Sequence, residues 1–151
     1  MSGSALVPRL LEHLVSRHGF ESIDASSVDA FVARPGAGLL VFTADPVRYR
    51  ETLDLAVIAP ELVRALPGRF ASVGVVLPDS AQAVHGRFAF RRWPALVIVR
   101  DGAYIGAIDG LREWSEYLSA IDALLQATKP AHAPIAIPVR VESAASQGGK
   151  P

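Results

Sequence analysis

The chain has 151 residues, half of them hydrophobic, and 15 Lys and Arg balance 15 Asp and Glu to give a formal net charge of zero. This length suits one domain, and the balanced charge lacks the positive footprint that nucleic-acid binding needs. Without cysteine, disulfides, thiolate metal sites and thiol redox chemistry are excluded. The four histidines show no metal-ligand spacing, and no apolar run approaches the ~20 residues of a membrane helix. We therefore expect a cytoplasmic protein with no metal, cofactor, nucleic-acid partner or membrane insertion.

Hydrophobic periodicity, capping residues and turn signals divide the first half of the chain into helices and strands. The predicted elements are a helix at 6–18, a strand at 20–24, a helix from Ser26 or Ser27 to 33, a strand at 38–43, a helix at 60–66 and a strand at 70–77. The strand at 38–43 is apolar throughout, which is typical of a central strand covered on both faces. Residues 47–59 mix charged and apolar side chains, and we interpret them as a long connection that is helical in part. Pro60 fits the first turn of the following helix.

The second half centres on an antiparallel hairpin. The predicted elements are a helix at 80–88, strands at 95–99 and 104–108, and a final helix at 112–127. Asp101-Gly102 between the two strands is a strong tight-turn signal. Pro94 has no N–H to donate to a strand ladder, so it must lie at the beginning of the first of these strands. In the final helix, Trp114 begins an apolar seam with 4-3-4 spacing, and we expect it to lie in the core.

The composition changes after residue 127. Residues 128–151 are rich in Ala, Pro, Ser and Gly, from which we predict a mobile tail behind a domain at 1–127. Apolar residues alternate at 135–141, so a short docked extended segment is the alternative. Within the domain, the alternation of strands and helices implies a parallel portion of the sheet, which the terminal hairpin makes mixed. The predicted class is α/β.

The order of these elements resembles thioredoxin. The strand at 38–43 leads into the loop where thioredoxins carry their active site, and residues 91–110 resemble the segment that holds their cis-proline. The resemblance implies a mixed central sheet flanked by helices, an extra N-terminal helix, and a cis Trp93–Pro94 bond. Where thioredoxins have Cys-x-x-Cys, residues 45–50 read Asp-Pro-Val-Arg-Tyr-Arg. The implied fold therefore lacks its redox chemistry.

A closer resemblance covers residues 42–52, the helix ending near Pro67, residues 88–114 and the final helix. These segments resemble the HyaE-type hydrogenase expression/formation proteins, cysteine-free members of the thioredoxin-like superfamily. The resemblance implies a non-enzymatic cytoplasmic chaperone in the maturation of an uptake nickel–iron hydrogenase. The implied partners are the small-subunit precursor, with its twin-arginine signal peptide, before export, and other maturation proteins. The alternative is a structural adaptor of the maturation complex that does not read the signal peptide. An enzyme is disfavoured, because no nucleophile or acid/base constellation replaces the missing cysteines.

The expected site binds a partner and contains no catalytic, cofactor-binding or metal-binding residue. In thioredoxin-like folds, the backbone just before the cis-proline pairs with an extended peptide, and Trp93 would add an aromatic anchor. The candidate partner-binding residues are Asp45, Pro46, Arg48, Tyr49, Leu53, Leu55, Arg92, Trp93 and Pro94. Other interpretations remain open for each group: Trp93 packs internally, the loop at 45–51 is merely solvated, and the apolar residues at 53–58 lie in the core under a helix.

Overall fold

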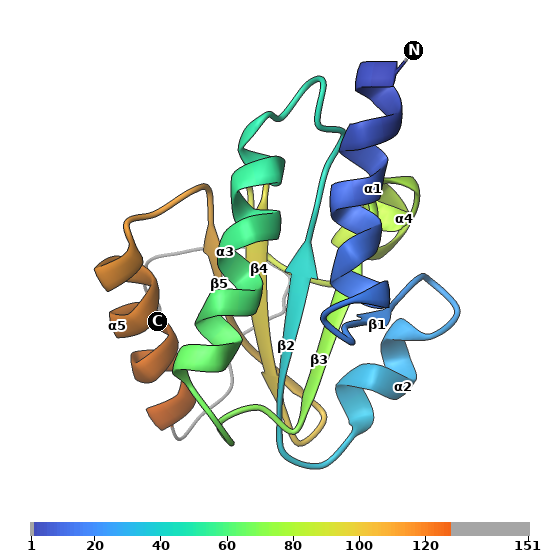
Figure 1. Cartoon of the computed structure of the whole chain (residues 1–151). Helices are drawn as coiled ribbons and strands as arrows, with labels where there is room; N and C mark the ends of the chain where they lie inside the picture. The colour runs from blue at the N-terminus through green and yellow to red at the C-terminus, as the bar shows by residue number, and fades with distance from the viewer. Residues whose placement is uncertain (1, 128–151) are drawn as a thin grey trace.

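The computed structural model describes residues 2–127, with side chains from residue 9 onward. In chain order the elements are α1 (Ser2–Ser16), β1 (Glu21–Ser22), α2 (Val28–Ala33), β2 (Ala37–Phe42), α3 (Glu51–Ala65), β3 (Ser72–Val76), α4 (Pro78–His85), β4 (Ala95–Arg100), β5 (Ala103–Asp109) and α5 (Trp114–Gln126) (Figure 1). The predicted tail at 128–151, and with it the predicted domain boundary, lies outside the described residues. None of the helices described is long and apolar enough to cross a membrane.

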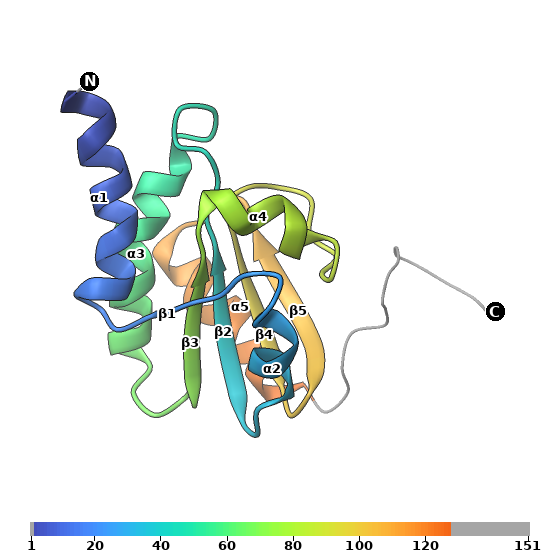
Figure 2. The ribbon, with the colours of Figure 1, turned by 90° about the vertical axis from the view of Figure 1, so that its right-hand side faces the viewer.

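The strands form one mixed sheet in the order β1-β3-β2-β4-β5. β3 pairs in parallel with both β1 and β2, whereas β4 pairs antiparallel with β2 and with β5. β2 is therefore the central strand, as its continuous apolar sequence predicts. Helices α1 and α3 lie on one side of the sheet and α2 and α4 on the other (Figure 2). This arrangement confirms the predicted mixed sheet with flanking helices and a preceding N-terminal helix.

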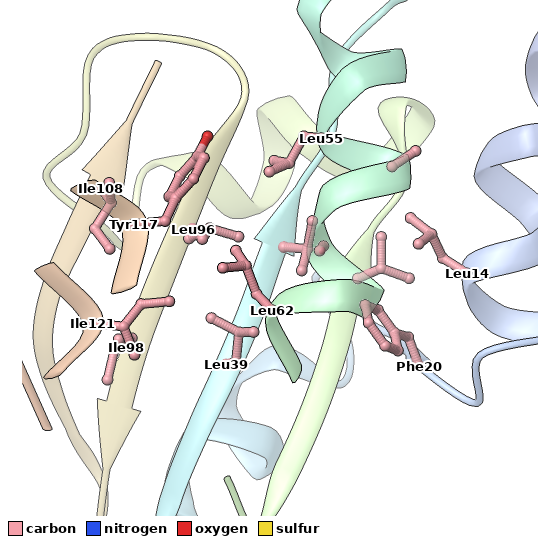
Figure 3. Close-up of a cluster of buried hydrophobic side chains, with 14 of the residues drawn as sticks. Leu14, Phe20, Leu39, Leu55, Leu62, Leu96, Ile98, Ile108, Tyr117 and Ile121 are labelled. Carbon is pink, nitrogen blue, oxygen red and sulfur yellow. The ribbon is translucent and has the colours of Figure 1, made fainter. Parts of the chain in front are cut away.

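Two apolar layers cover the two faces of the sheet. The first joins α1, α3 and α5 to the sheet, and Figure 3 shows its side chains converging between the helices and strands. Leu55 and Leu62 of α3 are fully buried in it, and each such side chain contributes about 1.5–3 kcal/mol through burial. The second layer lies under α2 and α4 and is rich in aromatic residues, including Phe31, Phe42 and Phe90.

Helix α3 differs from the prediction. It begins at Glu51, nine residues before the predicted start, and Pro60 lies inside it rather than in its first turn. An internal proline costs about 3 kcal/mol, because it cannot donate to the carbonyl four residues earlier. The buried positions of this helix, Leu55 and Leu62 among them, outweigh that cost, since each leucine contributes a comparable amount. The prediction that residues 47–59 are helical in part is confirmed for 51–59, whereas the predicted helix start at Pro60 is wrong.

Helix α5 also differs, because its buried face is rotated from the predicted seam. Tyr117 and Ile121 are buried, whereas Trp114 is 44% exposed, so the expectation that Trp114 lies in the core is wrong. Tyr117 is the larger buried side chain of this helix, and its hydroxyl donates to the Gly110 carbonyl at 3.3 Å, which keeps its polar atom bonded. Burial raises the pKa of the Tyr117 hydroxyl.

The β4–β5 hairpin and the Trp93–Pro94 bond that precedes it agree with the sequence analysis. Asp101 and Gly102 have φ angles of 51° and 88°, and the type I′ two-residue hairpin turn requires such positive values at both central positions. Trp93–Pro94 is a cis peptide bond, as expected from the resemblance. One smaller difference is that α4 begins at Pro78, two residues before the expected Ser80 start, with proline in its first turn.

Candidate functional site

The two predicted binding segments meet at one end of the sheet. Phe42, the last residue of β2, pairs with Ala95, the first residue of β4, so the loop at 43–50 and the turn at 91–94 leave the sheet side by side. The Tyr49 and Trp93 rings lie 6.3 Å apart, centroid to centroid. The structure therefore brings the candidate residues of both segments together (Figure 1 shows the loop between β2 and α3).

The loop at 43–50 is held by buried hydroxyl groups and one carboxylate. The Thr43 hydroxyl donates to the Val76 carbonyl at 2.8 Å, and the Thr52 hydroxyl accepts from the Ala44 N–H at 3.1 Å. Both threonines are fully buried. Asp45 closes the turn, because its carboxylate accepts from the Val47 N–H at 3.1 Å and its carbonyl from the N–H of residue 49 at 2.7 Å. The backbone of this loop is therefore fixed.

The turn at 91–94 depends on Asp109, which sequence reasoning missed. The Asp109 carboxylate accepts from the backbone N–H of Arg91 at 2.8 Å and of Arg92 at 3.1 Å. The Gly110 N–H donates to the Pro94 carbonyl at 2.8 Å. The signal that could have indicated this role is the Asp109-Gly110 pair directly after β5, opposite the start of β4.

Trp93 packs internally and also faces solvent, so each of the two interpretations given for it holds in part. Its ring lies in an aromatic cluster with Phe90, His85 and Phe42, at centroid distances of 5.1, 5.0 and 6.1 Å. The side chain is nevertheless only half-buried. Edge-to-face aromatic pairs such as Phe90–Trp93 add about 0.5–1.5 kcal/mol beyond burial, so the cluster holds the ring in one orientation while part of it faces solvent.

His85 fixes one side of this cluster. Its Nε2 lies 2.8 Å from the Phe90 carbonyl oxygen. A carbonyl only accepts, so this nitrogen must carry a proton. His85 was not among the residues that sequence reasoning selected, because a lone histidine in a helix gives no signal of its aromatic neighbours.

The backbone of Trp93 makes no hydrogen bond in this turn. Within residues 2–127, neither its N–H nor its carbonyl forms a hydrogen bond. Of the flanking groups, the N–H groups of Arg91 and Arg92 donate to Asp109 and the Pro94 carbonyl accepts from residue 110, whereas the carbonyls of Arg91 and Arg92 accept no hydrogen bond within residues 2–127. One donor and one acceptor on a partly exposed residue thus have no partner among the described residues.

The two apolar candidate residues of α3, Leu53 and Leu55, differ in burial. Leu55 is fully buried in the layer between α3 and the sheet (Figure 3), so it packs in the core and presents nothing to a partner. Leu53 is half-buried, and Val57, one helical turn later, is 63% exposed. The core interpretation therefore holds for Leu55, while Leu53 and Val57 border solvent.

We name the candidate surface the Trp93 face, defined as Asp45, Pro46, Arg48, Tyr49, Arg92 and Trp93; the remaining candidate of the turn, Pro94, is buried. It presents guanidinium groups, aromatic rings and the unpaired backbone N–H and carbonyl of Trp93. No group of three or more His, Asp or Glu residues in the described part of the chain is placed to hold a metal ion.

Comparison with known proteins identifies the family. Residues 10–117 match the family model of the Hydrogenase-1 expression protein HyaE. The hydrogenase expression/formation protein HoxO of Cupriavidus necator is 37% identical over 144 residues, covering 94% of this chain and 88% of that protein. The protein HupG of Bradyrhizobium diazoefficiens, described in the same words, is 33% identical over 132 residues, covering 85% and 88%.

Among solved structures, a mutant thioredoxin from Halobacterium salinarum aligns with a TM-score of 0.55 at 19% identity, covering 72% of this chain and 93% of that one. Identity at this level shows the fold alone, which is thioredoxin-like. The family match and the curated relatives extend over most of the chain. The chain therefore belongs to the HyaE family of hydrogenase expression/formation proteins, in a cysteine-free form of the thioredoxin-like fold.

Proposed function

We propose that this chain is a non-enzymatic chaperone in hydrogenase maturation and that it binds the hydrogenase small-subunit precursor on the Trp93 face, in the cytoplasm, before export. The family supports the maturation role, and the absence of cysteine leaves no thiol chemistry. The observation that carries the proposed site is the unpaired backbone of Trp93 beside its half-buried ring.

An extended segment of the precursor laid along residue 93 would pair with that backbone as an added strand. Two hydrogen bonds would contribute about 0.5–1.5 kcal/mol each. Trp93, as an aromatic anchor packed against the segment, would contribute about 2 kcal/mol or more. These terms sum to about 3–5 kcal/mol, whereas a Kd of ~1 μM is equivalent to about 8 kcal/mol after the entropy cost of association, so further contacts of the precursor must supply the remainder.

The test is calorimetric titration of the precursor into the parent protein and into two tryptophan variants. Trp93→Ala should weaken binding at least about tenfold, because the anchor is lost. Trp114→Ala removes the same side chain from an exposed position on α5, outside the Trp93 face, and should change the affinity less than about twofold. Circular dichroism on each variant establishes that it is folded. Equal losses in both variants would contradict the site.

A second candidate function, that of a structural adaptor, is supported by one observation. Val57 is 63% exposed on α3, next to half-buried Leu53 and Ile58, and exposed apolar groups that cluster mark interaction surfaces. An adaptor using this helix face would bind a maturation partner without reading the signal peptide. Val57→Asp should then abolish binding while Trp93→Ala leaves it intact, which is the reverse of the outcome expected for the leading proposal.

A further inference from the structure

We propose that residues 135–141, which lie outside the described residues, pair with the free edge of β5 as an antiparallel sixth strand of the five-stranded sheet. This inference is independent of the proposed function, and it selects the docked alternative for the segment after residue 127. Three observations carry it: the edge of β5 that has no partner strand, the point at which the described chain ends, and the positions of proline in the segment that follows.

β5 is an edge strand whose sequence does not protect it. Within residues 2–127, β5 pairs with β4 and with no other strand. It contains no lysine, arginine or proline, which are residues that commonly keep a further strand from pairing with an edge. A bulge at Ile105 interrupts the strand, and Gly106–Asp109 form its regular part. Proteins also protect an edge by covering it with another segment of the chain, and the residues after 127 are available for this.

The backbone groups that β5 directs away from β4 follow from the ladder. The Gly110 N–H donates to the Pro94 carbonyl, and Ala107 pairs in register with Val97, three residues along each strand. Because hydrogen-bonded and non-hydrogen-bonded pairs alternate in an antiparallel ladder, Ala107 directs its N–H and carbonyl toward the free edge. Neither group has a hydrogen-bond partner among residues 2–127.

The side chain of Ala107 lies on the face of the sheet that α2 and α4 cover incompletely. Tyr104 and Ala107 belong to the second apolar layer and are only half-buried, whereas Ile108 is buried in the layer that contains α5. A groove of about 330 Å³ lies between α2 and β5, and Val32, Phe88 and Tyr104 are part of its lining. A strand beside β5 with apolar side chains on this face would cover the groove.

The described chain ends beside the first residue of β5. A guanidinium N–H of Arg100 donates to the Ala127 carbonyl, and Arg100 pairs in register with Ala103. Residues 128–134 can span about 23–25 Å when extended, and a strand of the length of β5 spans about 24 Å. Residue 135 can therefore reach the far end of β5.

The direction of the added strand follows from the handedness of the fold. β2 and β5 point the same way, and α3 and α5 lie in the same layer. The right-handed connection through α3 leads from β2 toward the β1 edge (Figure 1). A parallel strand beyond β5 would lead the opposite way across the same face, which makes a left-handed crossover, whereas about 98% of such crossovers are right-handed. We therefore expect antiparallel pairing, with residue 135 near Asp109.

The prolines after residue 127 fit one orientation of this strand. They occupy the even positions 130, 134 and 138, whereas the alternating apolar residues occupy odd positions and are Ile135, Ile137, Val139 and Val141. Since successive residues of a strand direct their N–H groups to opposite edges, the odd residues can all donate to β5 while Pro138 faces the outer edge, where proline is tolerated. Residues directly opposite each other carry their side chains on the same face. The apolar side chains would therefore lie beside Ala107, over the half-buried face of β5.

The experiment measures backbone amide hydrogen exchange by nuclear magnetic resonance in the full chain. The parent protein is compared with Ile137→Pro, which removes an N–H from the edge that faces β5, and with Ala136→Pro, which removes one from the outer edge. We expect the Ala107 amide to exchange at least about tenfold faster in Ile137→Pro than in the parent, and within about threefold of the parent in Ala136→Pro. The Ile108 amide faces β4 and should change less than about twofold in both variants.

Equal exchange of the Ala107 amide in the parent and both variants would overturn the inference, as would an equal effect of the two prolines. Protection of Ala107 that persists in Ile137→Pro and increases with protein concentration would show that a second copy covers the edge, which also overturns it. Because no precursor is present in this experiment, its failure is distinct from a failure of the proposed function.

Discussion

Asp109 is predicted to hold the shape of the Trp93 face, and Asp109→Ala tests this directly. The substitution leaves two backbone N–H groups, those of Arg91 and Arg92, without their acceptor. Hydrogen bonds to a charged group contribute about 1.5–3 kcal/mol each. The Asp109 side chain is 25% exposed, so water recovers part of that loss. We expect the free energy of unfolding to fall by about 2 kcal/mol.

Urea unfolding followed by circular dichroism gives this difference, and calorimetric titration of the precursor gives its effect on binding. Affinity should fall together with stability, because the turn that presents Trp93 is no longer fixed at Arg91 and Arg92. Asp109→Asn is the matched control: its amide oxygen still accepts from the same N–H groups, so we expect it to lose less than half as much stability. An Asp109→Ala variant that keeps both parental stability and parental affinity would refute the role of the carboxylate.

Three further predictions concern the scaffold and the absence of redox chemistry. Leu55→Ala should cost about 2–5 kcal/mol in unfolding free energy, because it leaves a cavity between α3 and the sheet, whereas exposed Val57→Ala should stay within about 0.5 kcal/mol. Thr52→Val should cost about 1–3 kcal/mol, since it removes the acceptor of the Ala44 N–H in a buried site, and thermal denaturation measures this loss. Clean protein should reduce insulin no faster than the buffer background, because the chain has no cysteine; turnover above background would refute this.

Elements whose signals are local could be predicted from the sequence. The apolar run at 38–43 and the Asp101-Gly102 turn specify β2 and the β4–β5 hairpin with little help from distant residues. The start of α3 could not be predicted in this way. Pro60 normally marks a helix start, and only the burial of Leu55 and Leu62 against the sheet shows why the helix extends to both sides of it.

The candidate site was predictable in part for the same reason. The segments at 45–49 and 92–94 were selected through the resemblance to thioredoxin, and the pairing of β2 with β4 brings them together. The role of Asp109 depends on a contact 17 and 18 residues away along the chain, for which a single sequence has no signal. Trp114 appeared to be a core residue because its spacing fits a seam, but the buried positions of α5 are Tyr117 and Ile121.

The central claim, that the precursor lies on the Trp93 face, is tested most directly by site-specific photocrosslinking in cells that express the hydrogenase. A photoreactive p-benzoylphenylalanine replaces Trp93 in one strain and exposed Val57 in another. The proposed function predicts a crosslink from position 93 to the small-subunit precursor and none from position 57. A crosslink to the precursor from position 57 alone would contradict it.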